Sequence, residues 1–146
     1  MDVQIGADEP LWINRHLICE ICTCIKHDEY ETGGIIGVDE DGIIKKFQFD
    51  KNSSKDLYEY YPNTVFLEYV VNTILANDNI KLAGIIHSHF NNDEISQQDI
   101  YYAREIIKAN SCFSSIIIGI INQRNIRDEI KWYRVNMESV CELKEQ

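Results

Sequence analysis

The sequence has little that would divide the chain into parts. It contains only two prolines and seven glycines, with no Pro/Gly-rich linker, internal repeat or low-complexity tract. Its 146 residues therefore predict a single domain, residues 1–146, that is large enough to bury a hydrophobic core. No apolar run approaches the length of a membrane span, and Met1–Gln4 shows no signal-peptide pattern. We therefore expect a cytoplasmic protein without membrane contact.

Basic residues are also scarce, because 14 lysines and arginines stand against 24 acidic residues, a net charge of −10. Such a field repels phosphate backbones, and no basic stripe compensates for it, so we expect no nucleic-acid partner. A neutral or basic protein partner fits this charge better. The content of 45% hydrophobic and 26% charged residues is typical of a folded globular domain. Composition leaves the oligomeric state open.

Several catalytic motifs are missing. The sequence has no Gly-x-Ser-x-Gly elbow, no His-Glu-x-x-His helix and no phosphate-binding glycine loop. Serine-hydrolase, thermolysin-like and nucleotide-dependent chemistry are therefore unsupported. The five cysteines are an odd number without a secretory signal, which predicts reduced thiols. They are Cys19, Cys22, Cys24, Cys112 and Cys141.

Three of these cysteines lie close together in the sequence, near His16 and His27. On a helix Cys19 and Cys22 share a face, whereas Cys24 points elsewhere. We therefore predict apolar packing for this group rather than a second metal site.

Hydrophobic periodicity and turn residues predict three helices and five strands. The expected helices run from Leu11 to Ile25, from Pro62 to Leu75 and from Ser96 to Ile107. The expected strands are 35–38, 43–49, 81–87, 113–121 and 129–135, with 113–121 buried on both faces. This order predicts an α/β protein with a mixed β-sheet flanked by helices.

The strongest functional pattern is His87-Ser88-His89 at the end of an apolar run. In a strand, residues i and i+2 project to the same side, so both imidazoles face one point. Histidine nitrogens and carboxylate oxygens bind zinc, and catalytic zinc sites keep three protein ligands and an open position. Asp99 is the candidate third ligand. Ser96 and Asp99 also fit the start of a helix, Ser96 as N-cap and Asp99 at the third helical position.

Metal-assisted hydrolysis also needs a group that accepts a proton, and a carboxylate is the usual choice. Asp28, Glu29 and Glu31 all precede Gly33-Gly34, where small residues leave room for a substrate backbone. Spacing alone does not choose among these three carboxylates, although an acidic surface turn is the better interpretation of Asp28 and Glu29.

Three separated segments together resemble the JAMM signature of the JAB/MPN metalloprotease family: Glu31–Gly37 (ETGGIIG), Gly84–His89 (GIIHSH) and Ser96–Asp99 (SQQD). The resemblance spans about Leu11 to Val135 and implies a JAB/MPN, cytidine-deaminase-like architecture. The short length is similar to that of stand-alone prokaryotic JAB peptidases.

The resemblance also implies roles for individual residues. His87, His89 and Asp99 would bind one Zn²⁺ per chain. Glu31 would be the general base, and Ser96 would stabilise the oxyanion. The implied activity is a zinc peptidase or isopeptidase that acts on a ubiquitin-like protein or its conjugate.

The sequence departs from the family pattern at two points. Phe90 replaces the usual proline after the second histidine, and nine residues rather than ten separate His89 from Asp99. The implied setting is a bacterial ubiquitin-like conjugation system, including antiphage systems. Trimming of a sulfur-carrier protein and a non-catalytic MPN scaffold are the alternatives, and the acidic charge disfavours a DNA-repair branch.

The Gly33-Gly34 segment also suggests where substrate binds. We expect an extended tail to pair with the strand at Gly33-Gly34 by β-augmentation. The loop 52–61, with Tyr58, Tyr60 and Tyr61, would contact the folded partner or simply pack locally.

Overall fold

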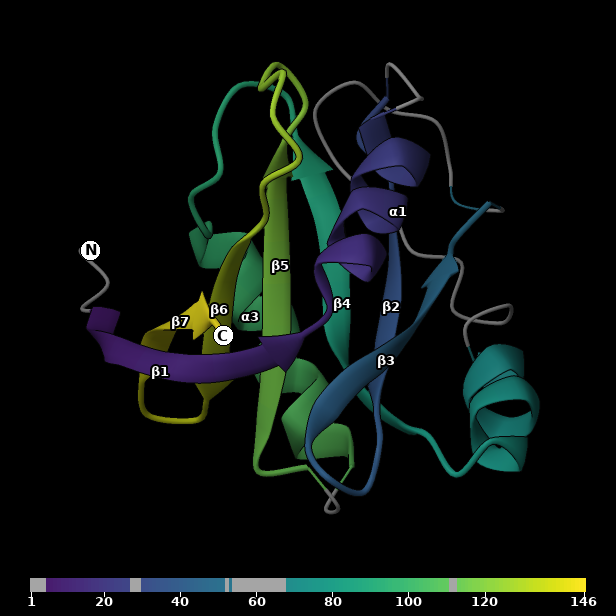
Figure 1. The fold of residues 1–146 in the computed structure, drawn as a ribbon. Coiled ribbons are helices and arrows are strands. Elements are labelled where there is room, and N and C mark those ends of the chain that lie inside the picture. The colour runs from purple at the N-terminus through teal and green to yellow at the C-terminus, as the bar shows by residue number, and fades with distance from the viewer. Residues whose placement is uncertain (1–4, 27–29, 52, 54–67, 111–112) are drawn as a thin grey trace.

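The computed structural model describes residues 5–26, 30–51, 53, 68–110 and 113–146. Within these residues the chain forms a closed, seven-stranded mixed β-barrel in the order β1-β3-β2-β4-β5-β6-β7. The strands are β1 Ile5–Ile13, β2 Gly33–Val38, β3 Ile43–Phe49, β4 Lys81–His89, β5 Ser115–Asn122, β6 Lys131–Asn136 and β7 Val140–Glu145. The helices are α1 Arg15–Lys26, the π-helical η1 Val70–Leu75 and α3 Gln97–Ala109 (Figure 1).

Closure of the barrel corrects the expected fold class, because a mixed sheet flanked by helices is wrong for this chain. Strand β1 runs parallel to β7, with Ile5 opposite Val140 and Leu11 opposite Glu145. Its end then pairs with β3, with Ile13 opposite Ile44. These pairings join the two ends of the chain, and neither β1 nor β7 was predicted from the sequence.

The first expected helix began too early. The structure ends β1 at Ile13 and begins α1 at Arg15, so Leu11 and Ile13 belong to a strand. Leu11 and Ile13 are buried while Trp12 between them is 52% exposed, which is the two-residue alternation of a half-buried strand. The later apolar residues do follow helical spacing, and the helix buries Ile18, Ile21, Cys22 and Ile25.

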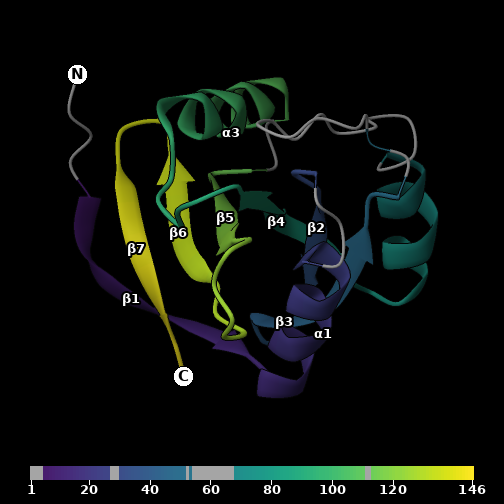
Figure 2. The same ribbon diagram turned by 90° about the horizontal axis from the view of Figure 1, so that it is seen from above.

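The two longer helices pack on opposite faces of the strands, as Figure 2 shows for α1 and α3. Helix α1 packs into a core cluster that includes Ile36, Ile86 and Ile117. Helix α3 packs into a second cluster that includes Ile116 and Ile118. Neighbouring residues of β5 therefore serve different cores, which confirms the prediction that this strand is buried on both faces.

The remaining expectations are met in part. The β2–β3 hairpin is confirmed, with Gly42 at φ +80 in its turn. Of the helix expected from Pro62, residues 62–67 lie outside the described residues, and residues 70–75 form η1. Strand β4 continues to His89, so both histidines lie within the strand itself.

None of the helices in the described part of the chain is long and apolar enough to cross a membrane.

Candidate metal centre

Strand β4 places His87 and His89 at its C-terminal end, on the face of the strand that α3 approaches. His87 lies between Gly33 of β2 and Ile120 of β5, so strands on both sides fix its backbone. His87 is 8% exposed. The i and i+2 positions bring both rings to the same side of the strand, as the sequence predicted.

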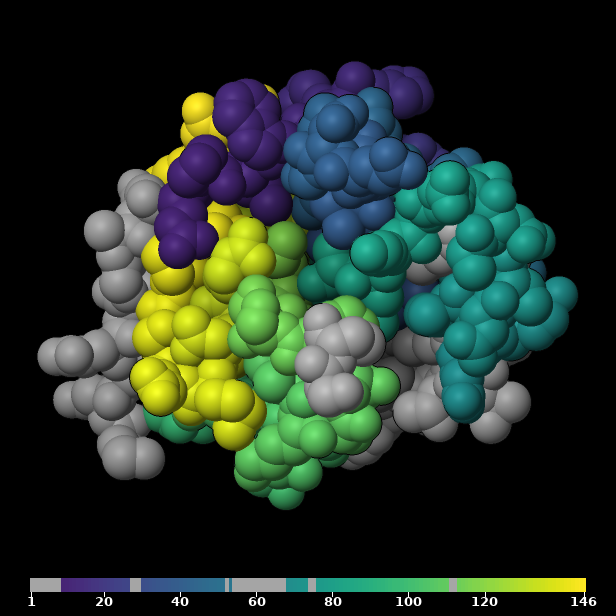
Figure 3. Space-filling view, turned by 90° about the horizontal axis from the view of Figure 1, so that it is seen from below, coloured from purple at the N-terminus to yellow at the C-terminus, as the bar shows by residue number. Residues whose placement is uncertain are grey.

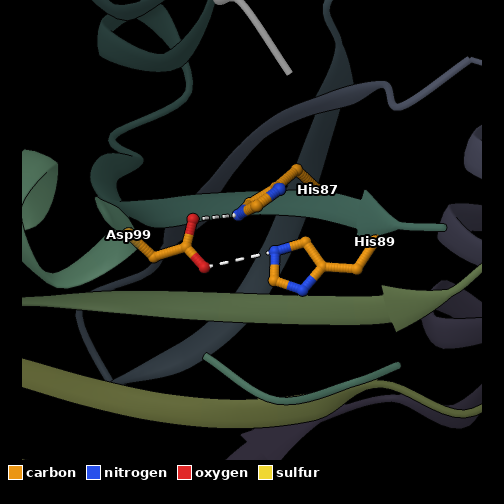
Figure 4. A group of neighbouring side chains, drawn as sticks. All are labelled: His87, His89 and Asp99. Atoms are coloured by element: carbon orange, nitrogen blue, oxygen red, sulfur yellow. Dashed lines mark ion pairs between the residues drawn. The ribbon is translucent and has the colours of Figure 1, made fainter. Parts of the chain in front are cut away.

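Helix α3 brings Asp99 to the two histidines (Figure 4). Asp99 Oδ1 lies 2.8 Å from His87 Nε2, and Asp99 Oδ2 lies 3.2 Å from His89 Nε2. One ligand atom from each of the three side chains lies within 4.8 Å of the others. The shortened spacing between His89 and Asp99 therefore still allows the aspartate to contact both rings.

A capping box fixes the position of Asp99. Ser96 is the N-cap of α3, and its Oγ accepts a hydrogen bond from Asp99 N at 3.1 Å. Asp99 Oδ2 in turn accepts a hydrogen bond from Ser96 N at 2.9 Å. These reciprocal bonds satisfy two of the free N–H groups at the helix start. The helix start therefore orients the carboxylate toward the histidines, so the cap and ligand interpretations of Asp99 are compatible.

The three side chains fit a divalent metal ion by their chemistry. Two imidazole nitrogens and one carboxylate oxygen are a common donor set for catalytic zinc, and three protein donors leave a position open. A ligating histidine usually has its second nitrogen held by a hydrogen-bond partner. His89 meets this condition, because its Nδ1 lies 3.2 Å from Asn92 Oδ1.

The same contacts perturb the proton affinities of Asp99 and His89. Burial raises the pKa of Asp99, but hydrogen bonds from His87 and His89 outweigh it and hold the pKa well below its usual range. Burial lowers the pKa of His89, but the hydrogen bond and charge of Asp99 outweigh it and raise the pKa. Ionised Asp99 is the form that binds a metal, whereas the raised pKa of His89 favours a protonated ring that would have to lose its proton before it could bind one.

Glu31 is a buried carboxylate beside this group. It is 5% exposed, and its Oε1 accepts a hydrogen bond from Phe90 N at 3.0 Å. Burial raises the pKa of Glu31, and the charges of His89 and His87 only partly offset this effect. Glu31 is thus a shielded carboxylate within electrostatic range of both histidines. Asp28 and Glu29, the other candidates, lie outside the described residues.

The backbone next to Glu31 is tied to β4 through Thr32 and Ser88. Ser88 N donates to Thr32 O at 2.9 Å, and Thr32 N donates to Ser88 Oγ at 3.0 Å. Both residues are buried. The serine between the two histidines therefore points away from the metal group and fixes the chain that carries Glu31.

The cysteine group near the N-terminus has no part in this site. Cys22 lies on the buried face of α1 and is fully buried in the core, which confirms its predicted role in apolar packing. Cys19 is half-buried and Cys24 is exposed, and all three are free thiols. Among the described residues, His87, His89 and Asp99 form the one group suited to a metal ion. His27 and Cys112 lie outside the described residues.

The expected substrate groove beside Gly33-Gly34 is wrong in the form predicted. Strand β2 already has a partner on each side, because Gly34 pairs with Phe49 of β3 and with Ile86 of β4. A β-carbon on Gly34 would lie 2.2 Å from Gln48 O. The absence of a side chain there allows close approach of β3 rather than of a substrate. The tyrosines of the loop 52–61 lie outside the described residues.

Sequence reasoning missed the residues that support the candidate ligands. Asn92 stands three positions after His89, and a polar loop residue so close to a ligand could have suggested its role. Ser88 could have been suspected because it separates the histidines. Gln123 N donates to His89 O at 3.0 Å, and no sequence pattern indicates this contact between distant segments.

A hollow of 340 Å³ lies at the other end of the barrel (Figure 3). Its lining includes Leu82 and Ala83 at the start of β4, with Trp12 and Arg134. Ala83 lies four residues before His87 along β4, which is about 13 Å at a strand rise of about 3.3 Å per residue. The hollow is therefore well separated from both histidines. It is therefore not part of the candidate metal centre.

Comparisons with known proteins find similar proteins by structure but not by sequence. A scan against protein-family models finds no match, and a search of curated protein sequences finds none. The structure is similar to that of protein DSY2949 from Desulfitobacterium hafniense, with TM-score 0.72 and 16% identity over 93% of this chain and 94% of that chain. It is also similar to AF2198, a JAB1/MPN domain protein from Archaeoglobus fulgidus, with TM-score 0.53 and 15% identity over 94% of this chain and 99% of that chain. The chain therefore shares its fold with a JAB1/MPN domain protein. Identities this low support the resemblance at the level of the fold alone.

Proposed function

We propose that this protein is a zinc-dependent peptidase or isopeptidase that cleaves at the C-terminal tail of a ubiquitin-like protein. The observation that carries the proposal is the convergence of His87, His89 and Asp99 beside the buried Glu31. A zinc ion held by the first three residues would supply Lewis-acid activation of a carbonyl and would lower the pKa of water toward ~7.

Glu31 is the proposed general base. A catalytic carboxylate at neutral pH works best when its proton affinity is raised, and burial has this effect on Glu31. Its hydrogen bond from Phe90 N fixes the carboxylate while leaving acceptor positions for a proton. Glu31 would take the proton from the attacking water and pass it to the leaving amine.

Ser96 is the proposed oxyanion-stabilising residue. Its Oγ accepts the hydrogen bond from Asp99 N, and the hydroxyl still has its own hydrogen to donate. Ser96 would donate that hydrogen to the carbonyl oxygen of the scissile bond as negative charge develops there. The capping box holds this hydroxyl at the helix start, next to the residue that would bind the metal.

The substrate class rests on the JAMM-like segments of the sequence and on the fold shared with a JAB1/MPN domain protein. A bacterial ubiquitin-like conjugation system, including an antiphage one, is the proposed setting. Trimming of a sulfur-carrier protein would need the same chemistry on a similar tail, so neighbouring genes and the preferred tail sequence would separate the two settings.

Metal analysis tests the first half of the proposal. Protein purified without chelator should hold about one zinc per chain, and His87→Ala should lose it. No zinc after supplementation would instead support the alternative of a non-catalytic MPN-type scaffold.

Cleavage tests the second half. The probe is a ubiquitin-like protein with a C-terminal fusion. We expect chelator-sensitive cleavage at the junction. Glu31→Gln should keep the zinc and lose turnover, whereas Glu29→Gln, the same chemical change two positions away, should cleave normally. Near-normal activity of Glu31→Gln would refute the role of Glu31.

A further inference from the structure

The connection from β5 to β6, residues 123–130, is anchored beside the metal group. Gln123 N donates to His89 O at 3.0 Å, directly behind one of the proposed ligands. Lys26, at the end of α1, donates its Nζ to Asn125 O at 2.8 Å and to Arg127 O. Figure 1 shows this connection standing next to the C-terminal end of β4. These hydrogen bonds therefore fix the β5–β6 connection in position next to the candidate metal centre.

Arg124 extends from the β5–β6 connection over Phe90, the residue that replaces the proline of the JAMM pattern. The Arg124 guanidinium carbon lies 4.6 Å from the centre of the Phe90 ring, which is a cation–π contact. Phe90 is 37% exposed, and its N–H donates to Glu31 Oε1. Phe90 thus makes two contacts: its ring packs against the Arg124 guanidinium, and its backbone N–H donates a hydrogen bond to Glu31, the proposed general base.

Arg124 differs from two other arginines of the chain in its contacts with carboxylates. Arg127, in the same turn, lies 3.8 Å from a carboxylate oxygen of Glu129, and Arg134 lies 3.1 Å from one of Glu9. Within the described residues, no carboxylate forms such a pair with Arg124, although the chain has 24 acidic residues. The contact with Phe90 holds the cation in place but uses none of its five N–H donors.

We propose that Arg124, supported by Phe90, is a specificity-determining residue that binds an acidic side chain of the substrate close to the scissile bond. This inference rests on the proposed function. A guanidinium binds a carboxylate through two parallel hydrogen bonds, which a lysine or a neutral side chain does not reproduce. The net charge of −10 repels an acidic segment elsewhere, so a cation at the rim of the site gives that segment one favoured position.

The test uses the fusion substrate described above, with Glu, Gln or Lys placed in turn at each position flanking the junction. At one of these positions the zinc-loaded wild type should prefer Glu over Lys by roughly tenfold in kcat/KM. Arg124→Gln should remove this preference, and Arg124→Glu should reverse it. Arg127→Gln, which makes the same charge change in the same turn, should retain it.

Binding provides a readout that does not depend on turnover. The affinity of Glu31→Gln for the same fusions is measured by fluorescence anisotropy, with and without zinc, and again after adding Arg124→Gln. A Glu-over-Lys ranking that Arg124→Gln removes supports the inference even if no fusion is cleaved. Chelator-sensitive cleavage without any such ranking would leave the proposed function standing and overturn the role of Arg124. Absence of the ranking in both assays would overturn it as well.

Discussion

Replacement of Ser96 by alanine separates the structural role of this residue from its proposed catalytic one. The substitution removes Oγ, which accepts the hydrogen bond from Asp99 N at 3.1 Å, and leaves that N–H without its cap. Loss of a serine N-cap costs about 1 kcal/mol of folding free energy. For a chain of this length the melting temperature should fall by about 3 °C.

The same change should weaken metal binding. Asp99 is held by Ser96 on one side and contacts His87 and His89 on the other. Without the cap the start of α3 frays more often in the metal-free protein, which lowers the fraction of molecules with Asp99 in its ligand position. Zinc binding should weaken by up to roughly fivefold, the factor that corresponds to about 1 kcal/mol. Urea unfolding of the metal-free protein measures the first effect, and competition with a chelating dye measures the second.

Ser96→Gly is the matched control. Glycine at an N-cap costs only a few tenths of a kcal/mol, so stability and zinc affinity should stay close to those of the wild type. Glycine has no side-chain donor, so turnover should still fall, on the order of 10²–10³-fold if Ser96 stabilises the oxyanion. Unchanged stability of Ser96→Ala would refute the capping argument, and full activity of Ser96→Gly would refute the catalytic one.

Two further predictions concern the fold. Gly34→Ala should lower the free energy of unfolding by roughly 1–3 kcal/mol, because its β-carbon would lie 2.2 Å from Gln48 O. Gly42→Asn, in an open turn at φ +80 that asparagine tolerates, is the control, and equal losses for both in urea unfolding would contradict this reasoning. Burial raises the pKa of Tyr133 from 10.0 to about 12, so the unfolded chain loses this proton first and stability should fall as pH rises through that window. Tyr133→Phe should flatten the decline in denaturant midpoint over the same range, and an unchanged slope would show that Tyr133 is not its source.

Much of the candidate metal site follows from local sequence rules. The pair His87 and His89 lies on one side of a strand because side chains alternate with period two. Ser96 and Asp99 lie at a helix start because their side chains satisfy free N–H groups there. Neither rule needs long-range information, and the structure agrees with both. Only the packing of α3 against the strands shows that these two local patterns meet, with Asp99 Oδ1 2.8 Å from His87 Nε2.

The sequence by itself therefore determined most of the elements between residues 15 and 136 and the candidate ligand set, whereas tertiary structure decided how the barrel closes. Apolar spacing at Leu11 and Ile13 is compatible with either a strand or the start of a helix, and only pairing with β7 and β3 selects the strand. Separate pairings enclose β2 between β3 and β4, which removes the predicted substrate groove at Gly34. Strands pair through backbone hydrogen bonds between distant segments. The side-chain periodicity of one segment does not show which other segment will pair with it.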